Sequence, residues 1–143
     1  MKDKALNFLG LMRKANAVQI GETDTGAAAR AMAAKLVVLA SDASDNARSR
    51  AKGFVYGRNI PMIISPFTKE EISGHVGKPG CSMLAITDIG FADAFMKLLM
   101  QISDSYTPTA ETISIELAKA KQRKKEKSAH DRNKKSGKRR NNA

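Results

Sequence analysis

The feature that most constrains this fold is the regular alternation of short apolar runs with segments of helical periodicity. Three runs, KLVVLAS, MIISP and SMLAIT, are continuously aliphatic over the length of a strand. Such runs are typical of strands that are covered on both faces. A fourth segment, AVQIG, predicts a short strand or an extended link. Together they predict an α/β fold, a three-layer α/β/α sandwich with a small mixed sheet of about four strands.

Five helices are expected around these strands, and capping residues mark several of their ends. Ser44 can cap the third helix, the S/T-x-x-E pattern beginning at Thr68 predicts a capping box for the fourth, and Asp88 can cap the fifth. The predicted helices run from the N-terminus to near Asn16, through the Ala-rich stretch to about Ala34, from Ser44 to about Tyr56, from Thr68 to Gly77, and from Asp88 through Ile102.

Charge is distributed very unevenly along the chain. The formal net charge is +11, yet residues 119–143 hold twelve Lys or Arg against two acids, so the rest is almost neutral. Because residues after 118 lack apolar periodicity, burial cannot offset the entropy of ordering them. We therefore predict one domain over 1–104, a connecting segment over 105–118, and a disordered basic C-terminal tail over 119–143, or a frayed helix there, when the chain is alone. The TISIEL pattern within 107–118 fits a strand or a helix equally well.

Cysteine and histidine usage excludes several classes of protein. With Cys81 as the single cysteine, an intramolecular disulfide is impossible, and Cys81, His75 and His130 are too few for a clustered zinc site. The N-terminal apolar run ends at Arg13 and Lys14 and is too short for a signal-peptide core or a membrane span. We expect a cytoplasmic protein with no metal, no cofactor and no membrane partner.

A phosphate-binding loop is a first candidate for chemistry, at Gly74-His75-Val76-Gly77-Lys78. The motif requires glycine where this chain has Ile72, and Ser or Thr where it has Pro79, so the glycines are better explained as a helix end. The prediction of a phosphate loop therefore fails.

Acids and the lone thiol are the next candidates. Asp42, Asp45 and Asp88 lie near strand or helix ends, but Asp45 and Asp88 are positioned as helix caps or first-turn acids. Cys81 close to Lys78 suggests an activated thiol, although a single loop cysteine is more often inert. His75 has no partner at ligand or triad spacing and fits an exposed helix position. We expect no enzyme and no small-molecule substrate.

The helix start GETDTGAAAR is unusual because it carries two acids and no base in a strongly basic chain. Composition alone favours Thr23 and Asp24 as residues that cap the helix. A second explanation comes from a resemblance. The runs LGLMRKANAVQIGETDTGAAARAMAAKLVVLASDAS, NIPMI, TKEEISGHVGKPG and SMLAITDIGFADAF, over about residues 5–100, closely resemble the bacterial YlxQ-like branch of the ribosomal kink-turn RNA-binding superfamily.

The resemblance implies how RNA is contacted. In that superfamily the start of the second helix enters the groove of a sharply bent RNA helix, at a kink lined by sheared G·A pairs, and a loop before the last strand covers an extruded base. It therefore implies RNA contacts by two groups of residues here. They are Gly21, Glu22, Thr23, Asp24 and Arg30, and, in the loop, Gly77, Lys78, Pro79, Gly80, Cys81 and Ser82.

The chain departs from the superfamily pattern at the helix start. Members with the strongest RNA pattern have Gly, Thr, Asn and Glu followed three residues later by Lys, whereas this chain has Gly21, Glu22, Thr23, Asp24 and Ala27. Asp24 can still accept hydrogen bonds from the amino and imino groups of guanine. The lysine is absent, and Arg30 is the nearest cation on about the same helix face.

The basic tail is an independent indication of RNA. Its cations alternate with Gln, Asn, Ser and Gly and with no aromatic residue, which suits phosphate contact rather than base stacking. The sequence thus predicts a monomeric protein that binds structured, kinked RNA, with ribosomal RNA or the ribosome as its setting. The alternative is a module that kept the fold, lost kink recognition, and serves as a protein-interaction or general ribosome-binding factor.

Overall fold

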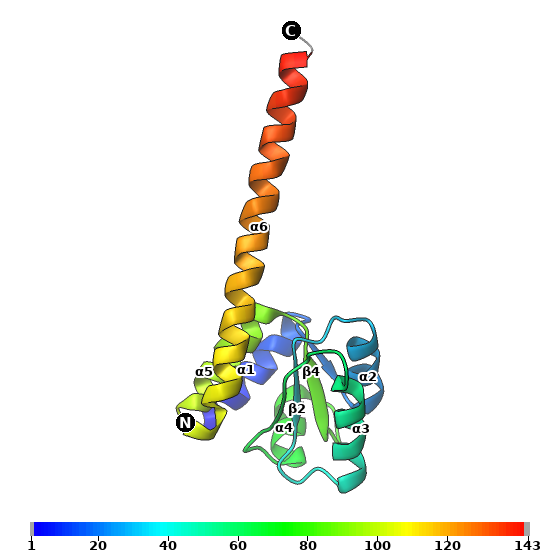
Figure 1. The fold of residues 1–143 in the computed structure, drawn as a ribbon. Helices are drawn as coiled ribbons and strands as arrows, with labels where there is room; N and C mark the ends of the chain where they lie inside the picture. Colours follow the sequence, from blue (N-terminus) through cyan, green and yellow to red (C-terminus); the bar gives the residue numbers. More distant parts are fainter. Residues whose placement is uncertain (1, 142–143) are drawn as a thin grey trace.

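The molecule is an α/β body from which one long C-terminal helix extends (Figure 1). The structure is a computed structural model that describes the backbone of residues 2–141 and the side chains of residues 2–131. Within the described residues, no helix is long and apolar enough to cross a membrane.

The sheet has four strands in the order β1-β4-β2-β3. β1 is Val18–Ile20, β2 is Leu36–Leu39, β3 is Met62–Ile64 and β4 is Met83–Ile86. β4 is antiparallel to both of its neighbours, while β2 and β3 are parallel. The predicted mixed sheet of about four strands is confirmed, and AVQIG is a strand rather than a link.

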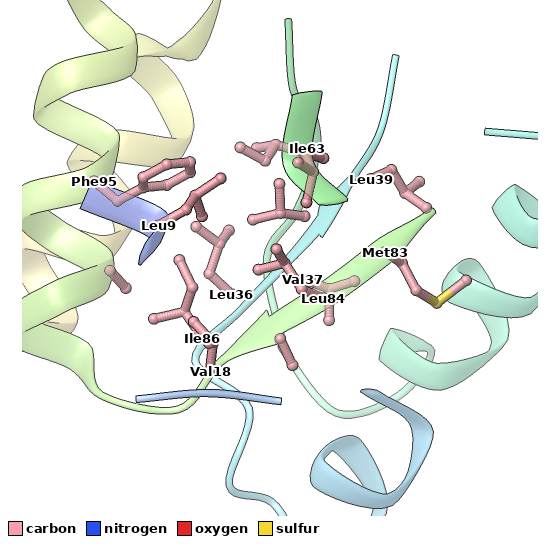
Figure 2. Packing of buried hydrophobic residues seen from close by; sticks show 14 of the residues in the cluster. Leu9, Val18, Leu36, Val37, Leu39, Ile63, Met83, Leu84, Ile86 and Phe95 are labelled. Carbon is pink, nitrogen blue, oxygen red and sulfur yellow. The ribbon is translucent and has the colours of Figure 1, made fainter. Parts of the chain in front are cut away.

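The two central strands form the middle of the core. Every residue of β2 and β4 is buried, as their continuous apolar runs predict. Figure 2 shows Leu9 of α1 (Lys2–Lys14) and Phe95 of α5 (Ile89–Met100) pointing toward these strands. The prediction that MIISP is also buried on both faces is wrong at Ile64, the last residue of β3. β3 lies at the edge of the sheet, and Ile64 is 45% exposed there.

Helices cover both faces of the sheet, which confirms the α/β/α sandwich. α2 (Glu22–Arg30) and α3 (Asp45–Val55) contact each other on one face. α1 and α5 pack together on the other face, where α4 (Lys69–Val76) contacts α1 (Figure 1).

Local capping residues set several helix ends as predicted. The Ser44 hydroxyl accepts from the Ala47 amide at 3.1 Å, and Asp88 accepts from the Phe91 amide at 2.9 Å. Thr68 and Glu71 form the full capping box, and Gly77 ends α4 in the left-handed conformation at φ 72°. These ends depend on neighbouring residues alone, which is why the sequence reveals them.

α2 ends at Arg30, earlier than the predicted end near Ala34. The chain turns there because the amides of Ala33 and Ala34 both donate to the carbonyl oxygen of Ala28. Met32, just before these two residues, takes a left-handed φ of 58°. Residues 31–34, Ala-Met-Ala-Ala, are all good helix formers, so the sequence contains no signal for this turn.

The segment after α5 is helical. A short 3-10 helix, Asp104–Tyr106, leads into α6 (Thr107–Asn141), which decides between the two conformations left open for 107–118. The start of α6 is fixed to the body: Ile113 is 1% exposed, and the Ser114 hydroxyl donates to Asp93 Oδ1 at 2.6 Å. The Tyr106 hydroxyl also donates to the carbonyl oxygen of Ile64 at 2.8 Å.

Of the two states predicted for the tail, disordered or a frayed helix, the structure has a helix, because α6 continues through residue 141. Residues 142–143 of that tail lie outside the described residues. Lys, Arg, Gln, Glu and Ala are good helix formers. The docked first turns also supply the costly helix nucleus, so later residues only extend it. From Lys121 to Asp131 every side chain is exposed, so burial contributes nothing to this part of α6.

Candidate nucleic-acid interface

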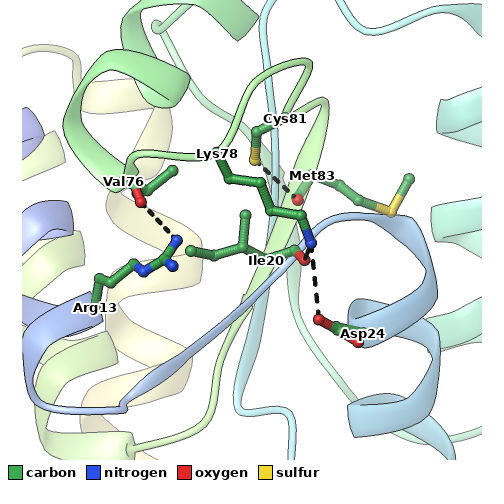
Figure 3. A network of polar contacts seen from close by, with 7 residues as sticks. All are labelled: Arg13, Ile20, Asp24, Val76, Lys78, Cys81 and Met83. Atoms are coloured by element: carbon green, nitrogen blue, oxygen red, sulfur yellow. Dashed lines mark hydrogen bonds and ion pairs between the residues drawn. The ribbon is translucent and has the colours of Figure 1, made fainter.

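The two segments that the sequence singled out lie side by side. We call them together the mouth, meaning residues 21–24 at the start of α2 and residues 77–82 in the loop between α4 and β4. The Gly21 amide donates to the carbonyl oxygen of Met83 at 3.0 Å, and Lys78 Nζ donates to the carbonyl oxygen of Ile20 at 2.9 Å (Figure 3). β1 and β4 are antiparallel neighbours, so the end of β1, which leads into residues 21–24, lies beside the start of β4, which follows residues 77–82.

Gly21 is the N-cap of α2, and its conformation requires glycine. Its φ is +95°, and a Cβ added there would lie 3.2 Å from Lys78 Nζ. No side chain caps this helix. The composition-based interpretation of Thr23 and Asp24 as caps is therefore wrong, because both side chains are exposed in the first turn instead.

Each acid of the mouth has a cation beside it. Glu22 forms an ion pair with Arg50 of α3. Asp24 Oδ2 lies 3.9 Å from Lys78 Nζ, and both of these side chains are about half exposed (Figure 3). Exposed ion pairs contribute only about 0–1 kcal/mol. Both pairs can therefore open at little cost when another charged group approaches.

Lys78 brings a cation to the place where the helix lacks one. Ala27 is exposed on α2 and carries no charge, but Lys78 reaches the first turn of that helix from a loop far along the chain. Arg30 is also exposed. A Cβ built on Gly26 would lie 3.1 Å from Arg30 Nη1, so this guanidinium lies one turn closer to the mouth than its own position in the sequence.

Arg13 ties the loop to the first helix. Its Nη1 donates to the carbonyl oxygen of Val76 at 2.6 Å, just before the loop begins (Figure 3). Arg13, Gln19, Asp24 and Lys78 line a shallow hollow of about 200 Å³ beside the mouth. Arg50 is the functional candidate that sequence reasoning missed, since only the packing of α3 on α2 brings it to Glu22.

The loop presents most of its predicted residues to solvent. Gly77, Lys78, Pro79 and Gly80 are exposed and Ser82 is half-buried. Cys81 is a correction: its side chain is 2% exposed and cannot contact RNA.

The burial of Cys81 also answers the question of an activated thiol. Its Sγ donates to the carbonyl oxygen of Met83 at 3.3 Å, and its amide donates to Ser73 Oγ at 3.1 Å. Burial raises the pKa of the Cys81 thiol, against weaker opposing hydrogen bonds. A thiol with a raised pKa is a poor nucleophile.

The acidic enzyme candidates have structural roles. Asp42 accepts from the Lys69 amide at 2.8 Å, Asp45 lies in the first turn of α3, and Asp88 caps α5. His75 is exposed, with Nδ1 2.9 Å from the carbonyl oxygen of Glu71. Across the part of the chain that the structure describes, no three His, Cys, Asp or Glu side chains gather as metal ligands would.

Comparison with known proteins places the chain in a family. It is 34% identical to the RNA-binding protein YlxQ of Enterococcus faecium over 98 residues, which cover 68% of this chain and 93% of that protein. A solved structure of a protein of unknown function from Bacillus halodurans C has a similar fold, with a TM-score of 0.61 and 24% sequence identity over 67% of this chain and 96% of that chain. No family model matches the sequence. The identity and coverage shared with the Enterococcus protein show that this chain belongs to the YlxQ family.

Proposed function

We propose that this protein binds RNA, and that the mouth recognises structured, kinked RNA while α6 adds phosphate contacts. The RNA-binding part is supported by the family relative, which is named as an RNA-binding protein. The kink-recognition part rests on the geometry of the mouth. We further propose that the protein is a monomeric, non-enzymatic binding protein of the cytoplasm and that its target is ribosomal RNA.

The observation that carries the proposal is the exposed first turn of α2. Thr23 and Asp24 do not cap the helix, so their oxygen atoms are available to a ligand. A carboxylate repels phosphate, but it can accept hydrogen bonds from guanine amino and imino groups. An acid at this place therefore favours contact with base edges over contact with the backbone.

Cations around the acid supply the attraction for phosphate. Lys78 lies beside Asp24, and Arg50 lies beside Glu22. We infer an exchange of partners on binding: RNA phosphates take Lys78 and Arg50, and the released carboxylates accept from guanine. The exchange is cheap because exposed ion pairs contribute about 0–1 kcal/mol. The unpaired amides at the start of α2 add donors for a phosphate.

α6 has a different part in the proposed function. Residues 119–131 carry six Lys or Arg against two acids, all on exposed or half-exposed positions. Phosphate contacts of this kind position RNA and raise affinity without reading sequence. We infer that α6 strengthens binding to any RNA and that the mouth selects the kinked one.

A titration of the full chain tests the proposal. Its affinity for a kink-turn RNA is compared with that for a straight duplex of equal length, and we expect a clear preference for the kinked RNA. Asp24→Ala is expected to weaken the kinked target alone by about 1–3 kcal/mol, the value of one good base contact. Glu111→Ala, which removes an exposed acid on α6, is the control and should leave that preference unchanged.

Two outcomes contradict the proposal. Equal affinity of the native chain for both RNAs would leave the alternative of a fold that has lost kink recognition, for which Ala27 is the relevant residue. An equal change in affinity with Asp24→Ala and Glu111→Ala, most simply the small gain expected when any acid is removed, would show that Asp24 acts only through its general charge.

A further inference from the structure

A second cleft lies at the opposite end of the sheet from the mouth. β1, β2 and β3 all run in one direction, since β4 is antiparallel to β1 and β2 while β3 is parallel to β2. The mouth lies where β1 ends. The cleft has a volume of about 530 Å³ and lies where β2 and β3 begin, with α6 as its outer wall.

The cleft combines an apolar floor with a cationic rim. Ile60 and Ile113 are almost fully buried and form the floor together with Ile89. Lys35, Arg58 and Arg123 supply the rim from three different parts of the chain. Pockets that bind small organic groups have this size and this mixture of apolar lining with a few polar groups.

The rim has an excess of positive charge. Glu116 is the acidic residue that lines the cleft, and Lys119 Nζ lies 3.5 Å from its carboxylate. Lys119 therefore offsets the charge of Glu116, and the charges of Lys35, Arg58 and Arg123 remain in excess. Arg58 also keeps donors free for a ligand, because the hydrogen bond that it makes, to the carbonyl oxygen of Phe54 at 3.2 Å, uses Nη1. A guanidinium offers five donors, and its planar fork matches a phosphate.

α6 connects this cleft with the basic helix surface. Glu116, Ala120 and Arg123 border the cleft, at a spacing that places them on one helix face. Beyond Arg123 the exposed part of α6 continues with Lys124, Lys125 and Lys127. A polyanion that follows α6 toward the body therefore arrives at the cleft.

We propose that this cleft binds one nucleotide of a single-stranded RNA segment, with the base on the isoleucine floor and the phosphate between Arg58 and Lys35. Proteins hold unpaired bases by stacking them on aromatic rings or guanidinium planes, or between apolar side chains, while cations track the backbone. An acidic peptide would satisfy the rim, but carboxylate side chains would leave the apolar floor unfilled. The inference rests on the RNA-binding part of the proposed function and is independent of kink recognition.

The test uses the full chain and a single-stranded RNA of mixed sequence, about ten nucleotides long, a length in the range of single-strand binding sites. The double variant Lys35→Gln/Arg58→Gln is expected to weaken this RNA roughly tenfold and to flatten the log-log salt slope by about 0.7, the value for one lost single-strand phosphate contact. The matched control is Lys2→Gln/Lys4→Gln, which removes the same charge from exposed positions at the start of α1.

A third variant separates the apolar floor from the charge. Ala120→Leu fills part of the cleft from the half-buried position of α6 that borders it, adds no aromatic surface for a base, and leaves the net charge unchanged. We expect a roughly tenfold loss of single-strand affinity with an unchanged salt slope, since the base loses room on the apolar floor while the phosphate contact remains. Circular dichroism of each variant verifies that the helix content is native.

Several results would overturn the inference. They are the absence of single-strand binding by the native chain, an equal loss in the cleft and control pairs, and displacement of the RNA by polyglutamate of equal charge at equal concentration. The last result would assign the cleft to an acidic protein. Failure of the kinked-RNA preference is a separate result, because the single strand contains no kink; in that case the cleft variants still decide the inference.

Discussion

The mouth and the exposed part of α6 are both charged surfaces, but they are built in opposite ways. In the mouth, acids and cations from α2, α3 and a loop are held next to each other, as in the pairs Glu22–Arg50 and Asp24–Lys78. On α6, residues 121–131 carry five cations, and none of them forms an ion pair among the side chains that the structure describes.

In the proposed function, this difference separates selectivity from attraction. The proposed selectivity needs fixed positions, and the mouth has backbone anchors such as the hydrogen bond of Lys78 to Ile20. Attraction needs only charge density, because counterion release from a polyanion depends on how many phosphates are neutralised. A chain whose body is almost neutral can therefore place acids in its binding surface and leave attraction to a helix outside the body.

Neutralising α6 is the strongest test of this separation. Replacing the six Lys and Arg of residues 119–131 with glutamine is expected to lower affinity for kinked and straight RNA alike, by roughly a thousandfold, and to remove a salt slope of about −5. Fluorescence anisotropy at several salt concentrations measures both quantities. If the kinked RNA lost much more affinity than the straight one, α6 would share in selectivity and the separation would be wrong.

Changing Lys78 should have a smaller and more selective effect. Lys78→Gln removes the cation beside Asp24 but keeps a side chain that can donate a hydrogen bond. We expect about a tenfold loss for the kinked RNA, equivalent to about 1.4 kcal/mol, and little change for the straight duplex. Lys4→Gln, an exposed lysine on α1, serves as the control in the same titration. A loss of equal size for both RNAs would mean that Lys78 behaves like a cation of α6.

The joint between the body and α6, where Ser114 donates to Asp93, should affect stability and have the smallest effect on RNA binding. Burial alone would raise the pKa of Asp93, but hydrogen bonds from Lys97 and Ser114 outweigh it, and the pKa is lowered. The ionised carboxylate therefore stabilises the fold above the unfolded-state pKa of about 3.9, and this contribution is lost as the pH falls through the lower folded-state pKa. Asp93→Asn should cost about 1–2 kcal/mol at neutral pH.

Thermal unfolding between pH 2 and pH 7 checks this expectation, and the native chain should lose more stability on acidification than Asp93→Asn does. Glu111→Gln, at an exposed position of the same joint region, is the control and should follow the native curve. Parallel curves for the native chain and Asp93→Asn would show that this carboxylate does not hold α6 to the body.

Local signals in the sequence predicted much of the fold. The caps at Ser44, Thr68 and Asp88 and the four strands were predicted because each depends on residues a few positions apart. The early end of α2 was not predicted, because a run of alanines carries no stop signal. For residues 119–141 composition left a disordered state and a frayed helix open, since it reports the lack of burial but not the docked first turns that start α6.

The candidate site divides in the same way. The resemblance indicated both segments of the mouth, including Thr23 and Asp24, which composition alone favoured as helix caps. It also included the buried Cys81 among surface contacts. Whether a loop side chain points outward or inward depends on what packs beneath it. No spacing rule within one loop distinguishes Cys81 from its exposed neighbour Gly80.

By itself, the sequence determined the α/β/α architecture, the near neutrality of the body and the concentration of positive charge after residue 118, because periodicity and composition are properties of short stretches. Only the tertiary structure decided that Lys78 and Arg50 stand beside the acids of α2, and that Lys35, Arg58 and Arg123 surround one cleft. These groups are far apart along the chain. Their electrostatic and packing energies depend on distances in space, which the sheet order and the docking of α6 set.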